Sequence, residues 1–244
     1  MKSRKQVAVL GLGRFGRATA RELARIGHDV LAIDADPKLV QAIADEVGHA
    51  VQADITDEEA LAQLGLEDYD AIIIGITGNL EVSILATVLL DRLGARRIIA
   101  KAADAIHGTI LERVGAHVVV YPEREAGFRI AHSFAAPAIR DYLDVVPGFG
   151  IARISVSERL AGRTLADHDL ARTYGVTPVA LCRAGRAVLS PSGTEILQVG
   201  DELIVAGFDV DLERVPTTSP VARTARMPPD SHSAEMRKES CDQV

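Results

Sequence analysis

The chain has 244 residues, of which 48% are hydrophobic and 25% are charged, and its formal net charge is -7. This length and apolar content support a buried core in one domain or two small ones. The acidic balance argues against nucleic acid as a partner, because a protein that binds the phosphate backbone needs a basic face.

The residue types and the cysteine count narrow the class further. Aromatic residues make up 4% of the chain and Trp is absent, so the core must consist of Val, Ile, Leu and Ala, as in buried parallel strands. The two cysteines, Cys182 and Cys241, form no C-x-x-C pair, which favours a reducing, cytoplasmic location. The longest apolar stretches, such as AIIIGI at 71–76, are far shorter than a membrane span.

The first half of the chain alternates between short β-branched runs and segments of helical length. This alternation is typical of βαβ units and a parallel sheet. The predicted strands are Gln6–Leu10, Asp29–Ile33, His49–Gln52, Ala71–Ile76, Arg97–Ala100 and His117–Val120. The predicted helices lie near Gly16–Ile26, Pro37–Glu46, Asp57–Leu64, Leu80–Leu93 and Ala105–Val114. Residues 1–124 are therefore predicted to form a Rossmann-like, doubly wound α/β lobe with a parallel sheet.

The segment Glu125–Leu143 has the pattern of one amphipathic helix, with Pro137 expected to kink or split it. Because the preceding sheet is already complete, this helix needs another surface to cover. It either packs back on its own domain, as most amphipathic helices do, or forms a subunit interface. Residues 125–146 are therefore a candidate interface segment, and the pattern alone leaves both possibilities open. The residues that recur at helical spacing are Phe128, Ala131, Ala135, Ala138 and Tyr142.

The pattern changes after VPGFG at Val146–Gly150, which has the composition of a hinge. Strands are predicted within IARISVS (151–157), TPVALCRAG (177–185) and DELIVAG (201–207), with a short helix and a loop between the first two. Residues 150–210 are therefore predicted to form a small α+β lobe. Residues 216–244 are rich in Pro, Ser and Thr without apolar periodicity, which predicts a disordered tail.

A glycine turn follows the first predicted strand and opens the first helix. Gly11 allows the tight turn, Gly13 lets a pyrophosphate approach the backbone, and Gly16 lets the helix pack against the strand. The helix N-terminus offers free N–H groups to phosphate. Asp34, at the end of the second strand, is placed to accept hydrogen bonds from ribose hydroxyls and to repel a 2′-phosphate. The pattern predicts a nucleotide site, with NADP disfavoured.

Other residues of this candidate site adjoin the turn or follow the later strands, at the edge where open α/β sheets bind ligands. Each of them, taken singly, is also compatible with ordinary turn chemistry or with a solvated charge. Their shared edge makes them candidates for the same site. The set comprises Phe15, Ala35, Ala53, Asp54, Thr77, Gly78, Asn79, Lys101 and Glu123.

The sequence offers little catalytic machinery. None of Tyr69, Tyr121, Tyr142 and Tyr174 is followed four residues later by Lys, as a single-domain reductase would require. Phosphate-loop, nucleophile-elbow and H-E-x-x-H motifs are missing, and the seven histidines show no metal-ligand spacing. A nucleotide bound here is therefore expected to be a signal, not a reactant.

Arg14 lies inside the glycine turn, where a guanidinium can form charge-assisted, bidentate bonds to phosphate oxygens. This favours a ligand rich in phosphate, such as ATP or ADP, and the guanidinium can also read the ligand of a neighbouring subunit. A solvent-facing arginine is the alternative. Glu123 can help to hold Mg²⁺ or Ca²⁺ against the phosphates, since hard cations prefer carboxylate oxygens. A solvated charge is again the alternative.

Several longer segments together carry a family resemblance. They are VLGLGRFG, HDVLAIDAD, QADITDEEAL, IGITGN, RIIAKA and ILERVGAHVVVYPEREAG, followed by LAGRTLADHDLARTYGVTPVALCRAG and SPSGTEILQVGDELIVAG. Over about residues 5–210 the chain resembles the RCK (KTN) family, which consists of cytosolic regulators of potassium channels and transporters. It is similar to the soluble regulatory subunits of Trk/Ktr potassium uptake systems.

The resemblance implies a Rossmann-like N-terminal lobe, a crossover helix and a smaller C-terminal lobe. It implies dimers that assemble into an octameric ring beneath a membrane potassium pore subunit, and a ring shape that differs between ATP and ADP or between NADH and NAD. By match to the family motif, Arg14 would meet the terminal phosphates, Asp34 the ribose and Lys101 the phosphate side. Glu123 would lie near a divalent ion linked to the nucleotide. The C-terminal lobe of some relatives binds cyclic di-AMP, through residues too variable to transfer.

The predicted function is a non-enzymatic, nucleotide-sensing gating subunit of a potassium channel or transporter, at the inner face of the cell membrane. Two alternatives stay open. One is an NAD-dependent oxidoreductase, and the other is a ligand-sensing regulator of another cation transporter.

Overall fold

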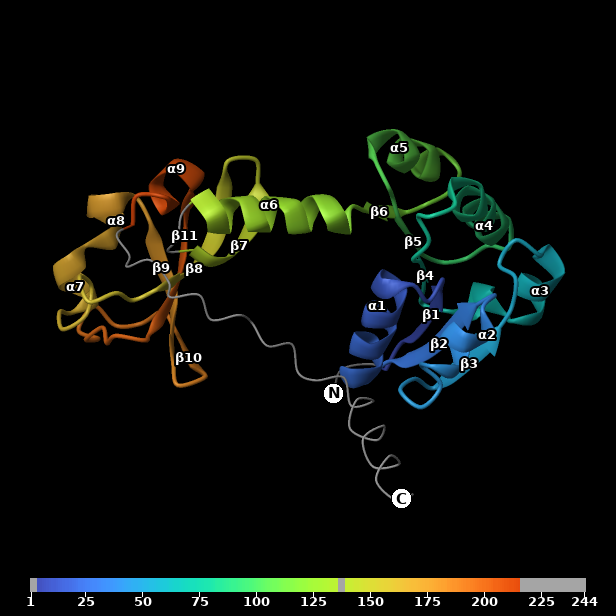
Figure 1. Ribbon diagram of the computed structural model, residues 1–244, viewed down its shortest axis with the longest axis horizontal. Coiled ribbons are helices and arrows are strands. Elements are labelled where there is room, and N and C mark those ends of the chain that lie inside the picture. Colours follow the sequence, from blue (N-terminus) through green and yellow to red (C-terminus); the bar gives the residue numbers. More distant parts are fainter. Residues whose placement is uncertain (1–3, 136–138, 216–244) are drawn as a thin grey trace, which may run out of the picture. The chain divides into compact units, whose positions relative to one another are not determined.

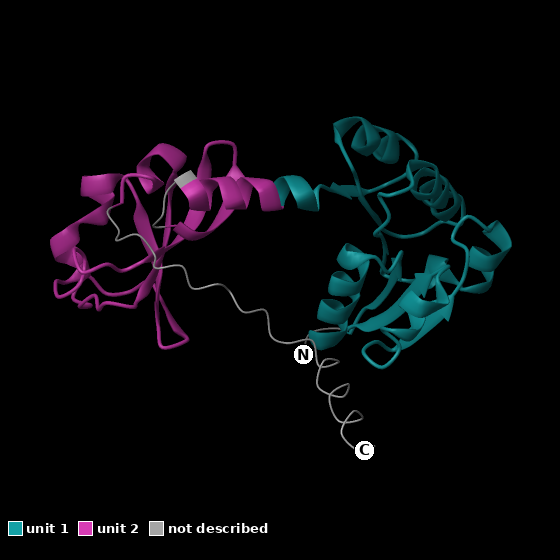
Figure 2. Ribbon diagram, in the orientation of Figure 1, with its two compact units in different colours: residues 1–125 teal, residues 126–244 magenta. Residues whose placement is uncertain are grey.

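The computed structural model describes residues 4–135 and 139–215. The chain divides into two compact units, residues 1–125 and residues 126–244, which Figure 2 shows in two colours. Each unit is built on a sheet of its own. The predicted fold class, a doubly wound parallel sheet followed by a small α+β lobe, is confirmed.

Unit 1 contains a six-stranded parallel sheet in the order β3-β2-β1-β4-β5-β6 (Figure 1). Its strands are β1 Gln6–Leu10, β2 Asp29–Asp34, β3 His49–Gln52, β4 Ala71–Ile74, β5 Ile98–Lys101 and β6 Val118–Val120. Its helices are α1 Arg14–Arg25, α2 Pro37–Gln41, α3 Glu58–Gln63, α4 Leu80–Arg92 and α5 Ala105–Arg113, with a 3-10 turn at Leu66–Asp68. The order reverses direction between β1 and β4, which is where open α/β sheets bind ligands.

Alternate residues of the central strands face two separate cores. Ala8 and Leu10 of β1 pack with apolar side chains of α3, α4 and α5, whereas Val7 and Val9 pack with those of α1 and α2. Helices therefore cover both faces of the sheet. This explains why the strands are continuous apolar runs in the sequence, without polar alternation.

Unit 2 contains a five-stranded antiparallel sheet in the order β10-β9-β11-β8-β7. Its strands are β7 Ile139–Val146, β8 Phe149–Ser155, β9 Thr177–Arg183, β10 Arg186–Leu189 and β11 Glu202–Phe208. Its short helices are α7 Leu165–His168, α8 Leu170–Tyr174 and α9 Asp209–Leu212. Strands β8, β9 and β11 match the predicted ones, and β7 and β10 were not predicted.

The helix predicted over Glu125–Leu143 is wrong in its second half. Helix α6 spans Pro122–Ala135, and strand β7 begins at Ile139, so Tyr142 is a strand residue. Strand β7 pairs antiparallel with β8 from Ile139 onward, and this pairing places the second half of the segment in the sheet of unit 2. Residues 136–138, which include Ala138 of the predicted stripe, lie outside the described residues.

The segment Val146–Gly150 is a hairpin turn inside unit 2 and does not act as a hinge before it. Val146 pairs with Phe149, so Pro147 and Gly148 form the loop between β7 and β8. Gly148 has φ +81°, which suits the glycine position of a type II turn after proline. The sheet of unit 2 therefore begins well before residue 150.

Among the described residues, no helix combines the length and the apolar character needed to cross a membrane. The predicted tail at 216–244, with Cys241, lies outside the described residues.

Candidate functional site

The glycine turn between β1 and α1 depends on close approaches between backbone segments. Gly11 has φ +88°, a conformation that favours glycine, and its N–H donates to the carbonyl oxygen of Ile33 on β2 at 2.8 Å. A Cβ atom on buried Gly16 would overlap the carbonyl oxygen of Gly11, whereas one on Gly13 would have no heavy atom within 4 Å. Gly16 therefore brings the helix against the strand, and Gly13 leaves space at the tip of the turn.

The N-terminus of α1 differs from those of the next four helices in unit 1. Helices α2, α3, α4 and α5 each begin with a side chain that accepts a hydrogen bond from a first-turn N–H. These caps are Asp36, Asp57, Asn79 and Asp104. Helix α1 begins at Gly13 with no side-chain cap. The N–H groups of a helix start need an acceptor, and a phosphate group suits this position.

Asp34 closes β2, and two backbone donors hold its carboxylate. Its Oδ2 accepts from the N–H of Leu12 at 2.6 Å, and its Oδ1 accepts from the N–H of Asp36 at 2.9 Å. The carbonyl oxygen of Ala35 accepts from Nε2 of Gln52 at 3.1 Å, which fixes the same loop to β3. Because each carboxylate oxygen has a further lone pair, this anchored, half-buried acid can also accept from a ribose hydroxyl.

Positive charge gathers beside the turn. The Lys101 side chain, at the end of β5, is 8% exposed, and its Nζ lies 2.6 Å from Oε1 of Glu123 and 5.6 Å from the centroid of the Phe15 ring. The hydrogen bond from Lys101 lowers the pKa of the Glu123 carboxyl, and the charges of Lys101 and Arg14 act in the same direction. Four of the predicted residues therefore interact at the start of α1: Arg14 and Phe15 of the helix, and Lys101 and Glu123 from distant parts of the sequence.

The remaining predicted residues adjoin the same edge, and two of them have local roles. Oδ1 of Asp54 accepts from the hydroxyl of Thr56 at 2.7 Å and from its N–H at 2.9 Å, and these bonds lower the pKa of Asp54. Asn79 caps α4 by accepting from the N–H of Val82 at 3.3 Å. The others are half-buried Ala53 and Thr77 and exposed Gly78.

Sequence reasoning missed a buried polar pair behind this edge. Oγ of Ser83 on α4 and Nε2 of His107 on α5 lie 2.9 Å apart, and both side chains are buried. Nδ1 of His107 accepts from the N–H of Ala103 at 3.1 Å. Burial lowers the pKa of the His107 imidazole, while the charge of Asp104 acts in the opposite direction. Asp104 caps α5 by accepting from the N–H of His107 at 2.8 Å, but no signal in the sequence pairs His107 with Ser83.

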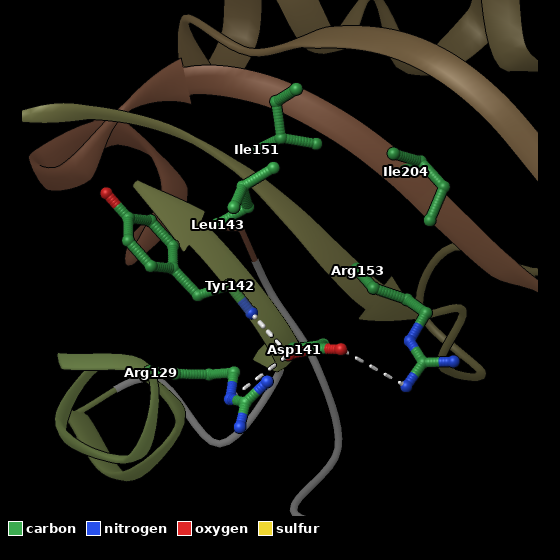
Figure 3. A pocket seen from close by; sticks show the side chains of 7 residues that line it. All are labelled: Arg129, Asp141, Tyr142, Leu143, Ile151, Arg153 and Ile204. Atoms are coloured by element: carbon green, nitrogen blue, oxygen red, sulfur yellow. Dashed lines mark hydrogen bonds and ion pairs between the residues drawn. The ribbon is translucent and has the colours of Figure 1, made fainter. Parts of the chain in front are cut away.

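Unit 2 has a hollow where α6 meets β7 and β8 (Figure 3). Asp141 on β7 lies between Arg129 of α6, at 3.9 Å, and Arg153 of β8, at 3.8 Å. The ring of buried Tyr142 stacks on that of His132, with the ring centroids 4.0 Å apart. These contacts attach α6 to the sheet of unit 2. The apolar lining of the hollow consists of Leu143, Ile151 and Ile204.

Comparison with known proteins assigns the family. The TrkA-N domain model matches residues 7–122, and the TrkA-C domain model matches residues 151–215. The Ktr system potassium uptake protein C of Bacillus subtilis (strain 168) is 39% identical over 211 residues, which cover 86% of this chain and 96% of the relative. The chain belongs to the RCK family. The Ktr system potassium uptake protein A of the same organism is 35% identical over 210 residues, covering 86% of this RCK chain and 95% of the relative.

Solved RCK structures have the same fold. The GsuK RCK domain superposes with a TM-score of 0.63 at 20% identity, over 90% of this chain and 49% of that chain. The GsuK channel bound to NAD superposes with a TM-score of 0.60 at 20% identity, over 91% of this chain and 41% of that chain. This RCK chain thus spans about half or less of each of those chains, and at this identity the likeness concerns the fold alone.

Proposed function

We propose that this RCK protein is a nucleotide-sensing regulatory subunit of a potassium uptake system. Its Bacillus relatives are potassium uptake proteins of almost the same extent. The observation that supports a nucleotide most directly is the uncapped N-terminus of α1, beside Arg14 and buried Lys101. A phosphate group would satisfy both the N–H groups of that helix and the positive charges around it. A GsuK channel structure bound to NAD supports a nucleotide in this fold.

In this proposal the glycine turn holds the phosphates. Gly11, Gly13 and Gly16 bring the backbone N–H groups close to the ligand. Arg14 and Lys101 neutralise phosphate charge, and Phe15 keeps the Lys101 ammonium in place through its ring face.

Other residues would hold the nucleoside. Asp34 accepts the ribose hydroxyls, and its charge disfavours a 2′-phosphate. Ala35, Ala53 and Asp54 are on the adenine side. The loop of Thr77, Gly78 and Asn79 adjoins the reversal between β1 and β4.

The nucleotide would act as a signal. A ligand shifts a conformational equilibrium only by binding its two states with different affinity. An ATP γ-phosphate that reaches Arg14 would supply this difference and ADP would lack it, with a coupling of about 1–3 kcal/mol being typical. We propose no catalytic residue. An NAD-dependent oxidoreductase is the alternative, and the missing Tyr and Lys pair argues against it.

A divalent ion fits Glu123 only together with nucleotide phosphates. Among residues 4–135 and 139–215, no three His, Cys, Asp or Glu side chains are grouped so that they could hold a metal ion. Glu123 is moreover paired with Lys101. Since Mg²⁺ and Ca²⁺ take about six or more oxygen ligands, the phosphates would have to supply most of them.

The proposal extends to assembly. We propose dimers that form an octameric ring beneath a membrane potassium pore subunit on the cytoplasmic side, with residues 125–146 in the dimer contact. Exposed apolar side chains on α6 support such a contact, because burial at an interface would remove them from water. They are Phe128, Ile130 and Phe134, exposed by 49%, 69% and 88%. Cyclic di-AMP is proposed as a second ligand, in the C-terminal lobe.

Thermal-shift titration with ATP, ADP, NAD, NADH and cyclic di-AMP tests this function. A ligand that binds the folded state raises its stability by mass action. We expect adenine nucleotides to raise Tm, and Arg14→Ala to weaken ATP binding about tenfold, as the loss of a charge-assisted contact does, so that ATP and ADP bind alike.

The matched control is Arg25→Ala, in the last turn of the same helix, where Arg25 pairs with Glu22 on the surface. This variant should discriminate ATP from ADP as the wild type does. A wild-type protein that responds to no nucleotide, or that oxidises NADH with turnover in the presence of a small metabolite, would contradict the proposed function.

A further inference from the structure

We propose that His107 is a positioning residue for the nucleotide site: it ties the loop after β4 to the loop after β5, and protonation of its ring weakens nucleotide binding. The inference rests on the proposed nucleotide-sensing function. The first loop contains Thr77, Gly78 and Asn79 and leads into α4. The second follows Lys101 and leads into α5.

Three hydrogen bonds meet at His107. Its backbone N–H donates to Oδ1 of Asp104 at 2.8 Å, and its Nδ1 accepts from the N–H of Ala103 at 3.1 Å. Both bonds fix the loop that comes directly after Lys101. The third joins Nε2 to Oγ of Ser83 at 2.9 Å and so connects this loop to the first turn of α4. His107 is 2% exposed and Ser83 is fully buried, so water cannot easily replace these partners.

The backbone donor selects the tautomer of the ring. Because Nδ1 accepts from the N–H of Ala103, the neutral ring carries its proton on Nε2 and donates it to Oγ of Ser83. The Ser83 hydroxyl donates in turn to the carbonyl oxygen of Leu80 at 3.1 Å. The carbonyl oxygen of Ser83 accepts from Oγ1 of Thr87 at 2.7 Å. Donors and acceptors along this buried chain are thus matched while the ring is neutral.

Protonation disrupts the match. A proton on Nδ1 would oppose the N–H of Ala103 and would leave a cation in a buried position. The titratable groups around the start of α5 include Asp104, Lys101 at the end of β5 and Tyr121 after β6. Helix α4 presents the neutral hydroxyl of Ser83 to the ring, and its own charged residues Glu81, Asp91 and Arg92 lie at its two ends, as Glu112 and Arg113 lie at the far end of α5. The charge of Asp104 favours the cation, but burial has the larger effect and lowers the pKa of His107. The ring is therefore neutral at neutral pH and gains its proton on acidification.

The consequence for the ligand follows from the position of the two loops. Lys101 is placed by the end of β5, and the loop that His107 holds begins immediately after it. Asn79 begins the helix that carries Ser83. Loss of the bridge releases both loops at the edge where Lys101 and Glu123 meet α1, although neither Ser83 nor His107 is exposed there.

Calorimetric titration with NAD, from about pH 8 down to about pH 5, tests the inference on the full chain. NAD is the suitable probe because its pyrophosphate does not titrate in the range where His does. In His107→Asn the amide oxygen can still accept from the N–H of Ala103, but the shorter side chain cannot reach Ser83. In His107→Gln the longer side chain can reach toward Ser83, but it cannot accept from the N–H of Ala103. We expect each to bind NAD about fivefold more weakly at the upper pH, the effect of one buried hydrogen bond. Both should lose the additional weakening that wild type shows on acidification.

Two further variants sharpen this experiment. Ser83→Ala keeps the Ala103 bond and removes the bridge, so a loss of about threefold is expected. His117→Asn is the matched control, since Nδ1 of His117 also accepts a backbone N–H, from Ile98 at 3.1 Å. His117 precedes β6, at the amino ends of the strands, so this variant should bind NAD as wild type does.

The outcomes separate this inference from the function on which it rests. Wild type that binds no nucleotide at any pH would refute both. Wild type that binds NAD while both His107 variants match His117→Asn in affinity and pH profile would refute the positioning role alone. The ¹⁵N chemical shifts of the wild-type His107 ring are a check that needs no variant. We expect Nε2–H and a ring that is neutral at pH 7, and a charged ring or Nδ1–H would overturn the inference.

Discussion

The two units differ in how many faces of their sheets are covered. In unit 1 both faces are covered by helices, and alternate residues of β1 enter two separate cores. In unit 2 one face is buried in a single core, while the other face presents Leu143, Ile151 and Ile204 along a hollow. A sheet that is covered on both sides leaves its edge for ligands, whereas a half-covered sheet offers a surface to a neighbouring element. Substitutions at the glycine turn of unit 1 should therefore affect both stability and ligand binding, and those in unit 2 should affect the stability of the sheet and its contacts.

The largest effect is expected for Gly16→Ala in unit 1. Its Cβ atom would overlap the carbonyl oxygen of Gly11, so the helix would have to move away from the strand. Overpacking at such a close backbone approach should lower the free energy of unfolding by about 3 kcal/mol, as measured by urea denaturation.

Gly13→Ala is the matched control for this experiment. Gly13 has φ -60° and open space around its Cβ position. The substitution should leave the stability within about 1 kcal/mol of wild type. It should weaken nucleotide binding, because the methyl group occupies space at the tip of the turn. Equal urea midpoints for the two variants would mean that the close approach of α1 to β1 does not limit stability.

This contrast between the units also explains which strands could be predicted from the sequence and which could not. The strands of unit 1 could be predicted because burial on both faces makes them uninterrupted apolar runs, such as Ala71–Ile74. Strand β7 was missed because it is an edge strand with a register shift between Ile139 and Asp141. The shift places the buried residues Ile139 and Tyr142 three positions apart, which imitates the spacing of a helix. Strand β10 is exposed along its whole length and therefore has no pattern to detect.

The candidate site likewise has features that could be predicted from the sequence and features that could not. The glycines, Asp34 and Lys101 could be selected because strand ends and turn chemistry are local in the sequence. The pairing of Lys101 with Glu123, and that of Ser83 with His107, could not, because each joins residues more than twenty positions apart. Hydrogen bonds over such separations depend on the order of the strands, which no single segment encodes.

A second prediction concerns the charged cluster of unit 2. Asp201 has a buried side chain and accepts from Nε and Nη2 of Arg183 at 2.8 and 2.7 Å, and from the N–H of Gln198 at 2.8 Å. Asp201→Asn keeps the shape and removes the charge. We expect the free energy of unfolding to fall by about 2 kcal/mol at neutral pH, the usual contribution of a charge-assisted hydrogen bond.

The effect should depend on pH in a defined direction. The hydrogen bonds from Arg183 lower the pKa of Asp201, so the carboxylate stabilises the fold above its unfolded pKa of about 4. This contribution disappears as the pH falls through the lower, folded value. The difference between wild type and Asp201→Asn should therefore shrink below about pH 4. Urea midpoints at several pH values measure it, and a difference that stays constant into strong acid would rule out the charge as its origin.

The smallest effect is expected where α6 meets the sheet of unit 2. The ring of His132 stacks on Tyr142, whose hydroxyl donates to Asp209 at 2.6 Å, so His132→Ala should cost about 0.5–1 kcal/mol through lost aromatic contact. Arg129→Ala is the comparison, because its pair with Asp141 is 3.9 Å long and exposed, and such pairs contribute little. Amide hydrogen exchange in β7 measures this local effect. Faster exchange in His132→Ala than in Arg129→Ala would show that the ring stack attaches α6 to the edge strand, while equal rates would assign the attachment to apolar contacts instead.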